Sequence, residues 1–101
     1  MPRLSDEQIA QELAQLPDWE YADNALRREF RFRTFREAMA FVNAVADLAE
    51  ELRHHPDITI TYNRVQLALT SHDSGGVTER DVNFVKQLEQ RQLWHVRWGE
   101  S

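Results

Sequence analysis

The spacing of hydrophobic residues along this chain switches between helical and strand periods. Ser5, followed by Asp6-Glu7-Gln8, predicts a helix start with acidic residues in its first turn, and Pro17 predicts the end of that short helix. Between residues 19 and 33, apolar side chains alternate with charged ones on either side of an Asp23-Asn24 turn. That pattern predicts a β-hairpin with one solvated face.

A longer helix is predicted next. Thr34 can cap it, with Glu37 completing a capping box, and Pro56 stops it because the residue before a proline is pushed out of the helical region. Apolar residues recur inside it at three- and four-residue steps, which predicts a buried stripe made of Phe35, Ala38, Met39, Val42, Val45, Ala46, Ala49 and Leu52.

A second hairpin and a last helix follow. Ile58, Ile60 and Tyr62 alternate with threonines, which predicts a packed Tyr62, and the alternation resumes after a turn at Asn63-Arg64. Thr78 begins the last helix, whose capping box would use Asp81 in place of the usual Glu or Gln. Residues 94–98 fit either an extension of that helix or a terminal strand. The predicted fold is α+β: a single domain over residues 1–101, with a four-stranded antiparallel sheet and about three helices packed on one face.

Composition narrows the possible functions. A chain of 101 residues with 42% hydrophobic residues can build one core, and its formal charge of −5 argues against a general nucleic-acid binder. The absence of cysteine excludes disulfides and thiolate metal sites. There is no apolar run of about 20 residues and no signal peptide's apolar segment, so we expect no membrane partner and a cytoplasmic location.

The candidate chemistry lies around the adjacent histidines His54 and His55, which this pattern places in the last turn of the long helix. Glu50 lies four residues before His54, and Glu51 four before His55, so a helix would set each carboxylate beside an imidazole. Histidine gains and loses a proton near neutral pH, and a neighbouring carboxylate fixes which ring nitrogen carries it. These groups could therefore serve as a general acid and base.

His72, at the end of the second hairpin, lies on the strand parity of Thr70 and could be brought near the helix end by the fold. Each member also has a structural interpretation: helix capping for His54 and Asp81, a solvated surface for His55, and a loop entry for His72. Three histidines could instead bind zinc and leave a position for water. Adjacent histidines at a helix end point in different directions, so we expect no metal.

The whole spaced set resembles the pterin-4a-carbinolamine dehydratases. The resemblance rests on residue types and spacings together, over about a third of the chain: Glu50, His54-His55-Pro56, Tyr62, His72 and Asp81, with the flanking segments 62–65, 67–72 and 76–81. It implies dehydration of a 4a-hydroxytetrahydropterin to the quinonoid dihydropterin, without a redox cofactor. It also implies a homodimer or homotetramer.

The resemblance further implies roles for individual residues. His54 and His72 would be the acid/base pair, His55 would bind and polarise the pterin and share in proton transfer, and Glu50 would orient His54. The segments Arg53–His55 and Thr70–Asp73 would line the pterin site with backbone groups that match the ring. The supporting residues would be Pro56, Tyr62 and Asp81, while Ser71 and Asp73 fall within the second lining segment.

Two positions depart from the family as the animal enzymes show it. Arg53 stands where they carry an acidic residue, and Ile58 stands where they carry tryptophan. Loss of an aromatic wall would weaken ring stacking, and Arg53 changes the local field. These differences raise an alternative function, a pterin-binding or partner-stabilising module without useful catalysis.

Overall fold

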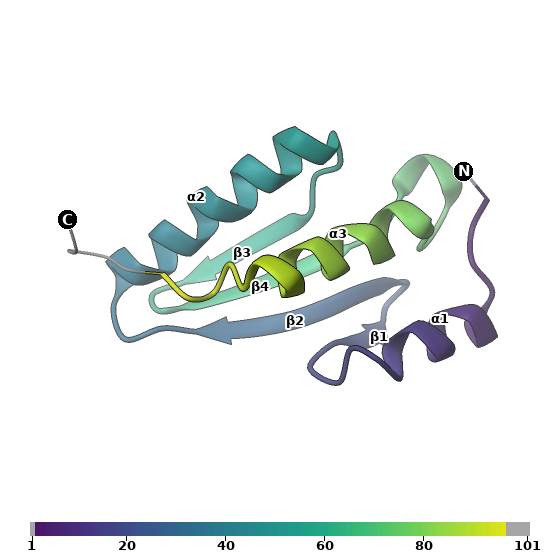
Figure 1. Ribbon diagram of the computed structural model, residues 1–101, viewed down its shortest axis with the longest axis horizontal. Coiled ribbons are helices and arrows are strands. Elements are labelled where there is room, and N and C mark those ends of the chain that lie inside the picture. The colour runs from purple at the N-terminus through teal and green to yellow at the C-terminus, as the bar shows by residue number, and fades with distance from the viewer. Residues whose placement is uncertain (1, 97–101) are drawn as a thin grey trace.

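A computed structural model describes residues 2–96 of the chain. Its elements follow the predicted order (Figure 1): α1 Asp6–Leu13, β1 Glu20–Ala22, β2 Ala25–Arg31, α2 Phe35–Leu52, β3 Asp57–Thr61, β4 Arg64–Leu69, the short 3₁₀ turn η1 His72–Ser74, and α3 Glu79–Arg91. The four strands pair antiparallel in the order β1-β2-β4-β3. The predicted α+β fold is confirmed.

Local sequence signals explain where each helix begins. Ser5 and Gln8 form a capping box at α1, the Thr34 side chain accepts from the backbone N–H of Glu37 at α2, and Thr78 forms a second capping box with Asp81 at α3. Such side chains satisfy N–H groups that have no partner inside the helix. All three predicted helix starts are therefore confirmed. The capping box predicted at Thr34 is only half formed, because Glu37 Oε1 accepts from the backbone N–H of Arg33 at 2.8 Å.

The core lies between one face of the sheet and the helices, with α2 and α3 side by side in Figure 1. Leu26 and Phe30 of β2 face it together with Val65, Leu67 and Leu69 of β4, while Glu29, Arg31 and Gln66 on the other face are exposed. Register explains this shared face, because Leu26 pairs with Leu69 and Phe30 with Val65. The solvated sheet face predicted for the first hairpin is confirmed.

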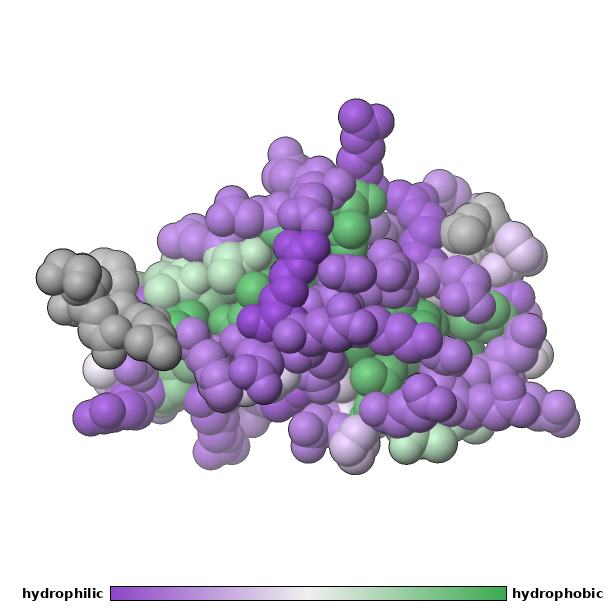
Figure 2. Space-filling model, viewed as in Figure 1, coloured by the Kyte–Doolittle hydropathy of each residue, from purple (hydrophilic) through white to green (hydrophobic). Residues whose placement is uncertain are grey.

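The buried stripe of α2 differs from the predicted one. Phe41 and Leu48 lie in the core beside Ala38, Val45 and Ala49. Phe35, by contrast, is 48% exposed, and Met39 and Ala46 are also outside the core. The helix carries apolar residues on more than one face, and three- and four-residue steps alone did not identify the buried face. In Figure 2 apolar residues surface along α2, whereas hydrophilic groups cover most of this view.

The second hairpin turns one residue earlier than predicted. Thr61 pairs with Arg64, so the turn residues are Tyr62 and Asn63. Asn63 is held in place because its side chain donates to the Phe32 carbonyl oxygen at 2.9 Å and its own carbonyl accepts from Phe32 N–H at 2.8 Å. Tyr62 has a left-handed backbone, with φ of 53°, and is 67% exposed. The prediction that Tyr62 is packed was wrong.

The chain after α3 neither extends the helix nor forms a strand as far as Val96. α3 ends at Arg91, residues 92–94 form a turn, and the Trp94 ring lies 6.2 Å from that of Phe30. The predicted segment beyond Val96, including Trp98, lies outside the described residues. Within residues 2–96, no helix has the length and apolarity needed to cross a bilayer.

Candidate functional site

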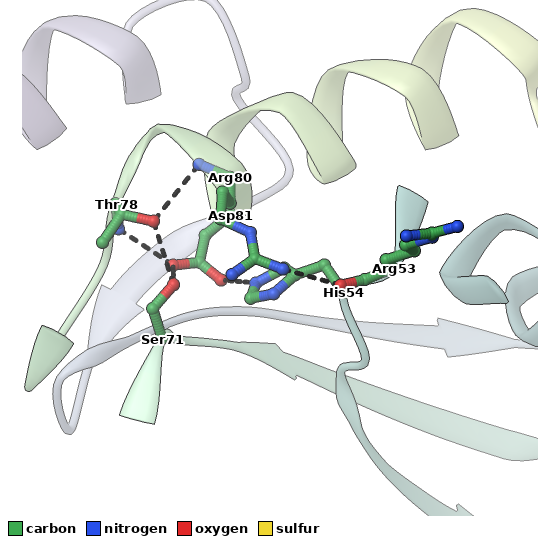
Figure 3. Close-up of polar contacts among 6 residues, drawn as sticks. All are labelled: Arg53, His54, Ser71, Thr78, Arg80 and Asp81. Carbon is green, nitrogen blue, oxygen red and sulfur yellow. Dashed lines mark hydrogen bonds and ion pairs between the residues drawn. The ribbon is translucent and has the colours of Figure 1, made fainter. Parts of the chain in front are cut away.

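The side chain of Asp81, in the first turn of α3, joins the two histidine-bearing segments (Figure 3). Its carboxylate is fully buried, and Oδ2 accepts from the Thr78 backbone N–H at 2.9 Å and from the Ser71 hydroxyl at 2.8 Å. The other oxygen, Oδ1, is hydrogen-bonded to Nε2 of His54. The predicted capping role of Asp81 is confirmed, and its contacts with His54 and Ser71 were not anticipated.

His54 is buried against this carboxylate, with only 8% of its surface exposed. Its backbone N–H donates to the Ala49 carbonyl at 3.1 Å, which satisfies an acceptor at the end of α2. The expectation that Glu50 orients His54 was wrong, since Asp81 takes that position. A buried imidazole whose Nε2 is engaged in this way is well suited to hold other groups in place.

The α2 helix ends before the histidines, at Leu52, rather than including them. Arg53 is the residue that ends it, with a left-handed backbone (φ 53°, ψ 42°). The guanidinium of Arg80 donates to the Arg53 carbonyl oxygen at 2.6 Å and fixes this turn from α3 (Figure 3). The Arg53 carbonyl oxygen thus already accepts a hydrogen bond from Arg80. Because the histidines lie beyond the end of the helix, the predicted four-residue helical spacing between the glutamates and the histidines does not apply.

The early helix end changes both predicted carboxylate–histidine pairs. Glu50 Oε2 lies 2.6 Å from Nε2 of His55, not beside His54, and both side chains are mostly exposed. Glu51 does not lie beside His55; it makes a two-pronged ion pair with Arg91, with N–O distances of 3.0 and 2.6 Å. Hydrogen bonding from Arg91 lowers the pKa of Glu51 below its ordinary value of 4.5.

The second histidine-bearing segment follows β4. Ser71 is buried and pairs with Gly76 through backbone bonds of 3.0 and 3.2 Å, which close the loop around η1. His72 and Asp73, in that loop, are exposed, and Thr70 just before it is half-buried. Gly75 has φ of 75°, a left-handed conformation that favours glycine, and ends η1. His72 is therefore presented to solvent by a loop anchored through Ser71 to Asp81.

A cavity of about 240 Å³ opens beside His72. Besides His72 and Thr70, its lining comes from the β1–β2 turn, the first residues of β2, the start of β3 and the glycine loop: Asp23, Asn24, Ala25, Arg27, Asp57, Gly75 and Gly76. Asn24 ties two of these walls together, because its side-chain amide donates to the Gly75 carbonyl at 2.9 Å. His54 and His55 are not among the described residues that line this cavity.

Sequence reasoning missed the residues that the first hairpin and β3 contribute to this cavity. The alternation pattern predicts only a turn position for Asn24 and a strand position for Arg27. Asp57 follows the His54-His55-Pro56 motif directly, and that adjacency was the available signal. The half-buried Pro56 lies between the histidine pair and β3, and its supporting role stays a prediction.

Tyr62 lies apart from these groups. It occupies the turn at the far end of β3, whereas Asp57 and the histidine pair are at the near end. Five strand residues separate the two ends, roughly 16 Å at the usual rise per residue. Among residues 2–96, no three side chains of the His, Asp and Glu type gather closely enough to hold a metal ion.

The arrangement offers two exposed imidazoles, His55 and His72, on two loops held by the start of α3. An exposed imidazole can donate or accept a proton near neutral pH. Glu50 fixes the ring orientation of His55. The buried His54–Asp81–Ser71 network sets the position of both loops.

Comparison with known proteins identifies the family of this chain. The family model described as pterin 4 alpha carbinolamine dehydratase matches residues 2–91. A relative from Thermomicrobium roseum is 59% identical to this chain over 88 residues. The match covers 87% of this chain and 95% of the relative, whose name assigns it provisionally to these dehydratases. One from Chloroflexus aurantiacus, with the same name, is 53% identical over 90 residues, covering 89% and 97%.

Solved structures share the fold. A crystal structure of a transcriptional coactivator/pterin dehydratase from Brucella melitensis aligns with a TM-score of 0.81 and 34% identity, over 87% of this chain and 96% of that one. A pterin dehydratase-like protein identified as a RuBisCO assembly factor in the alpha-carboxysome aligns at a TM-score of 0.59 and 24% identity, over 78% and 89%. With the family model matching nearly the whole described chain, this protein belongs to the pterin-4a-carbinolamine dehydratase family.

Proposed function

We propose that this protein dehydrates a 4a-hydroxytetrahydropterin to the quinonoid dihydropterin and water by histidine general acid–base catalysis. The observation that carries the proposal is that one buried carboxylate, Asp81, holds both histidine-bearing loops. Family membership supplies the substrate class. The anchored loops supply groups that can transfer protons.

The reaction needs one proton donor and one proton acceptor. The C4a–O bond breaks as the hydroxyl group is protonated and leaves as water, the N5–H proton is removed, and a C4a=N5 double bond forms. Nothing is oxidised or reduced, so no redox cofactor takes part. General acid and base groups typically contribute about 10²–10⁴-fold to such steps.

His72 and His55 are the groups to which we assign the proton transfers. His72 lies in the cavity wall and is exposed, and His55 is exposed and oriented by Glu50. His54, which the family resemblance implied as an acid or base, has its Nε2 engaged by Asp81 and little exposed surface. We assign it a positioning role, acting through Asp81 on the loop that carries His72.

In this proposal the pterin lies in the cavity beside His72 and extends beyond it toward His55, which does not itself line the cavity. Asp57, the first residue of β3, lines it together with Thr70 and His72, which follow the neighbouring strand β4. The backbone of residues 53–55 and 70–73 supplies further donors and acceptors. Because the Arg53 carbonyl already accepts from Arg80, the backbone contribution of that segment comes from its other residues.

The test is quinonoid product formation, followed spectroscopically with freshly made 4a-hydroxytetrahydropterin, together with equilibrium binding of a non-reacting pterin. Turnover well above the spontaneous rate supports the enzyme. Tight pterin binding with no rate above background supports the alternative, a pterin-binding or partner-stabilising module.

We also propose a homodimer or homotetramer. β3 lies at the edge of the sheet, with the sequence Asp57-Ile-Thr-Ile-Thr61, and leaves one row of backbone groups unpaired within the described chain. Such β-branched edge strands pair readily with another strand. Ile60 on this strand is 39% exposed and Phe35 on α2 is 48% exposed, and burial of such side chains would favour association.

A further inference from the structure

Asp57 has no role in the mechanism above, although it lines the cavity that contains His72. It is the first residue of β3 and pairs with Ala68 of β4, with Pro56 immediately before it. A proline restricts its own backbone φ, and strand pairing fixes the next residue. The Asp57 carboxylate is therefore attached to a rigid part of the cavity wall and is exposed.

This carboxylate has unused hydrogen-bonding capacity. Between residues 2 and 96, no ion pair or side-chain hydrogen bond involves Asp57. Across the sheet, Asp57 of β3 pairs with Ala68 of β4, and Ala68 pairs on its other side with Arg27 of β2. Arg27 already donates to the carbonyls of Ala22 at 2.8 Å and Asp23 at 3.4 Å.

A pterin presents a group that suits a free carboxylate. Its pyrimidinone ring carries an N3–H and a 2-amino group side by side, and these two parallel donors resemble one edge of a guanidinium. A carboxylate accepts two such bonds at once, which adds orientation as well as affinity. We infer that Asp57 binds the N3–H and 2-amino donors of the pterin ring and so selects 2-aminopteridines; this inference rests on the proposed function.

Asp23 is the competing carboxylate, since it also lines the cavity. It lies in the two-residue β1–β2 turn, with a left-handed backbone (φ 50°), and its carbonyl holds Arg27. Asp57 is favoured because strand pairing fixes it and because only Pro56 separates it from His55. Binding at Asp57 would therefore orient the ring with respect to the histidine pair.

The experiment compares binding of 6-methylpterin with binding of 6-methyllumazine, which carries an oxygen in place of the 2-amino group. Equilibrium titrations are done on the wild-type protein, on Asp57→Asn and on Asp23→Asn. Asp47→Asn is the charge-matched control, since Asp47 is exposed on α2 and away from the cavity. Turnover of 4a-hydroxytetrahydropterin is measured on the same samples.

The wild type should prefer the pterin, and Asp57→Asn should reduce that preference about 10- to 100-fold, as expected for hydrogen bonds to a charged group. Asp23→Asn and Asp47→Asn should keep it. The inference is overturned if Asp57→Asn keeps the preference, if Asp23→Asn loses it, or if the wild type shows none. Wild-type turnover with an unaffected preference in Asp57→Asn leaves the proposed function standing without this inference. A preference for the pterin that depends on Asp57, in a protein without turnover, supports this inference and contradicts the proposed catalytic function.

Discussion

The His54 imidazole and the Asp81 carboxylate, 27 residues apart in sequence, meet inside the protein where α2 ends and α3 begins. Asp81 is simultaneously part of the α3 capping box and an acceptor for Ser71. Through this contact, the two loops that carry His55 and His72 share one buried anchor. A buried polar group that loses its hydrogen-bond partner costs free energy. The His54–Asp81 pair should therefore contribute to the stability of the fold as well as to the site.

Asp81→Ala should lower the free energy of unfolding by about 3–5 kcal/mol, since it leaves the buried His54 without its partner and removes half of a capping box. It also removes one of the two partners of the Ser71 hydroxyl, which remains hydrogen-bonded to Thr78 Oγ1 at 2.9 Å. His54→Ala should lower the free energy of unfolding by a smaller amount, about 2–3 kcal/mol, because the capping bonds of Asp81 remain. Denaturant unfolding measures both. Asp47→Ala, at an exposed helix position, is the control. An Asp81→Ala protein as stable as this control would refute the anchoring role.

Glu51 should make stability slightly sensitive to acid. Its pKa is lowered from 4.5 by hydrogen bonding from Arg91, so its stabilising contribution is complete above that value and is lost as the pH falls below it. The wild type should therefore exceed Glu51→Gln in unfolding free energy at about pH 7, with the difference shrinking toward about pH 3. Both side chains are substantially exposed, so the difference should be small. A gap that widens in acid would contradict this pairing.

Tyr62→Asn should leave turnover unchanged, since Tyr62 lies in the turn at the far end of β3 from the histidines. Stability should hold or rise by up to about 1 kcal/mol, because asparagine tolerates the left-handed backbone better than tyrosine. Rates and thermal unfolding on the same preparation provide the check. A large fall in the turnover of a fully folded Tyr62→Asn protein would show that Tyr62 contributes to the functional site.

Ile60→Lys should shift the protein toward smaller assemblies, because a lysine on an edge strand opposes pairing with another strand. Light scattering during size-exclusion chromatography measures the mass. Gln66→Lys adds the same charge to the central strand β4 and should leave the assembly unchanged. Equal masses for wild type and Ile60→Lys would mean that the β3 edge does not mediate association.

Local signals predicted most of this fold. Ser5, Thr34 and Thr78 act within one helical turn, so their capping could be inferred from the chain alone. The Asp23-Asn24 turn is similarly local, and both residues have the positive φ that such turns tolerate. These features depend on neighbours in sequence rather than on tertiary packing.

The errors arose where tertiary contacts or one backbone angle decided the outcome. The left-handed conformation at Arg53 ended α2 early and replaced the helical pairing of Glu50 with His54 by one with His55. The contact between His54 and Asp81 joins distant segments and has no local signature. Tyr62 alternates correctly for a strand, yet it lies in the turn that Asn63 fixes through Phe32.

The most direct test of the central claim is the rate of quinonoid dihydropterin formation by His72→Ala compared with wild type, with folding checked by circular dichroism. His72 is exposed, so its loss should not unfold the chain. We expect the wild type to exceed the spontaneous rate clearly and His72→Ala to lose about 10²–10⁴-fold of that enzymatic rate. A folded His72→Ala protein that dehydrates the carbinolamine at the wild-type rate would contradict the account.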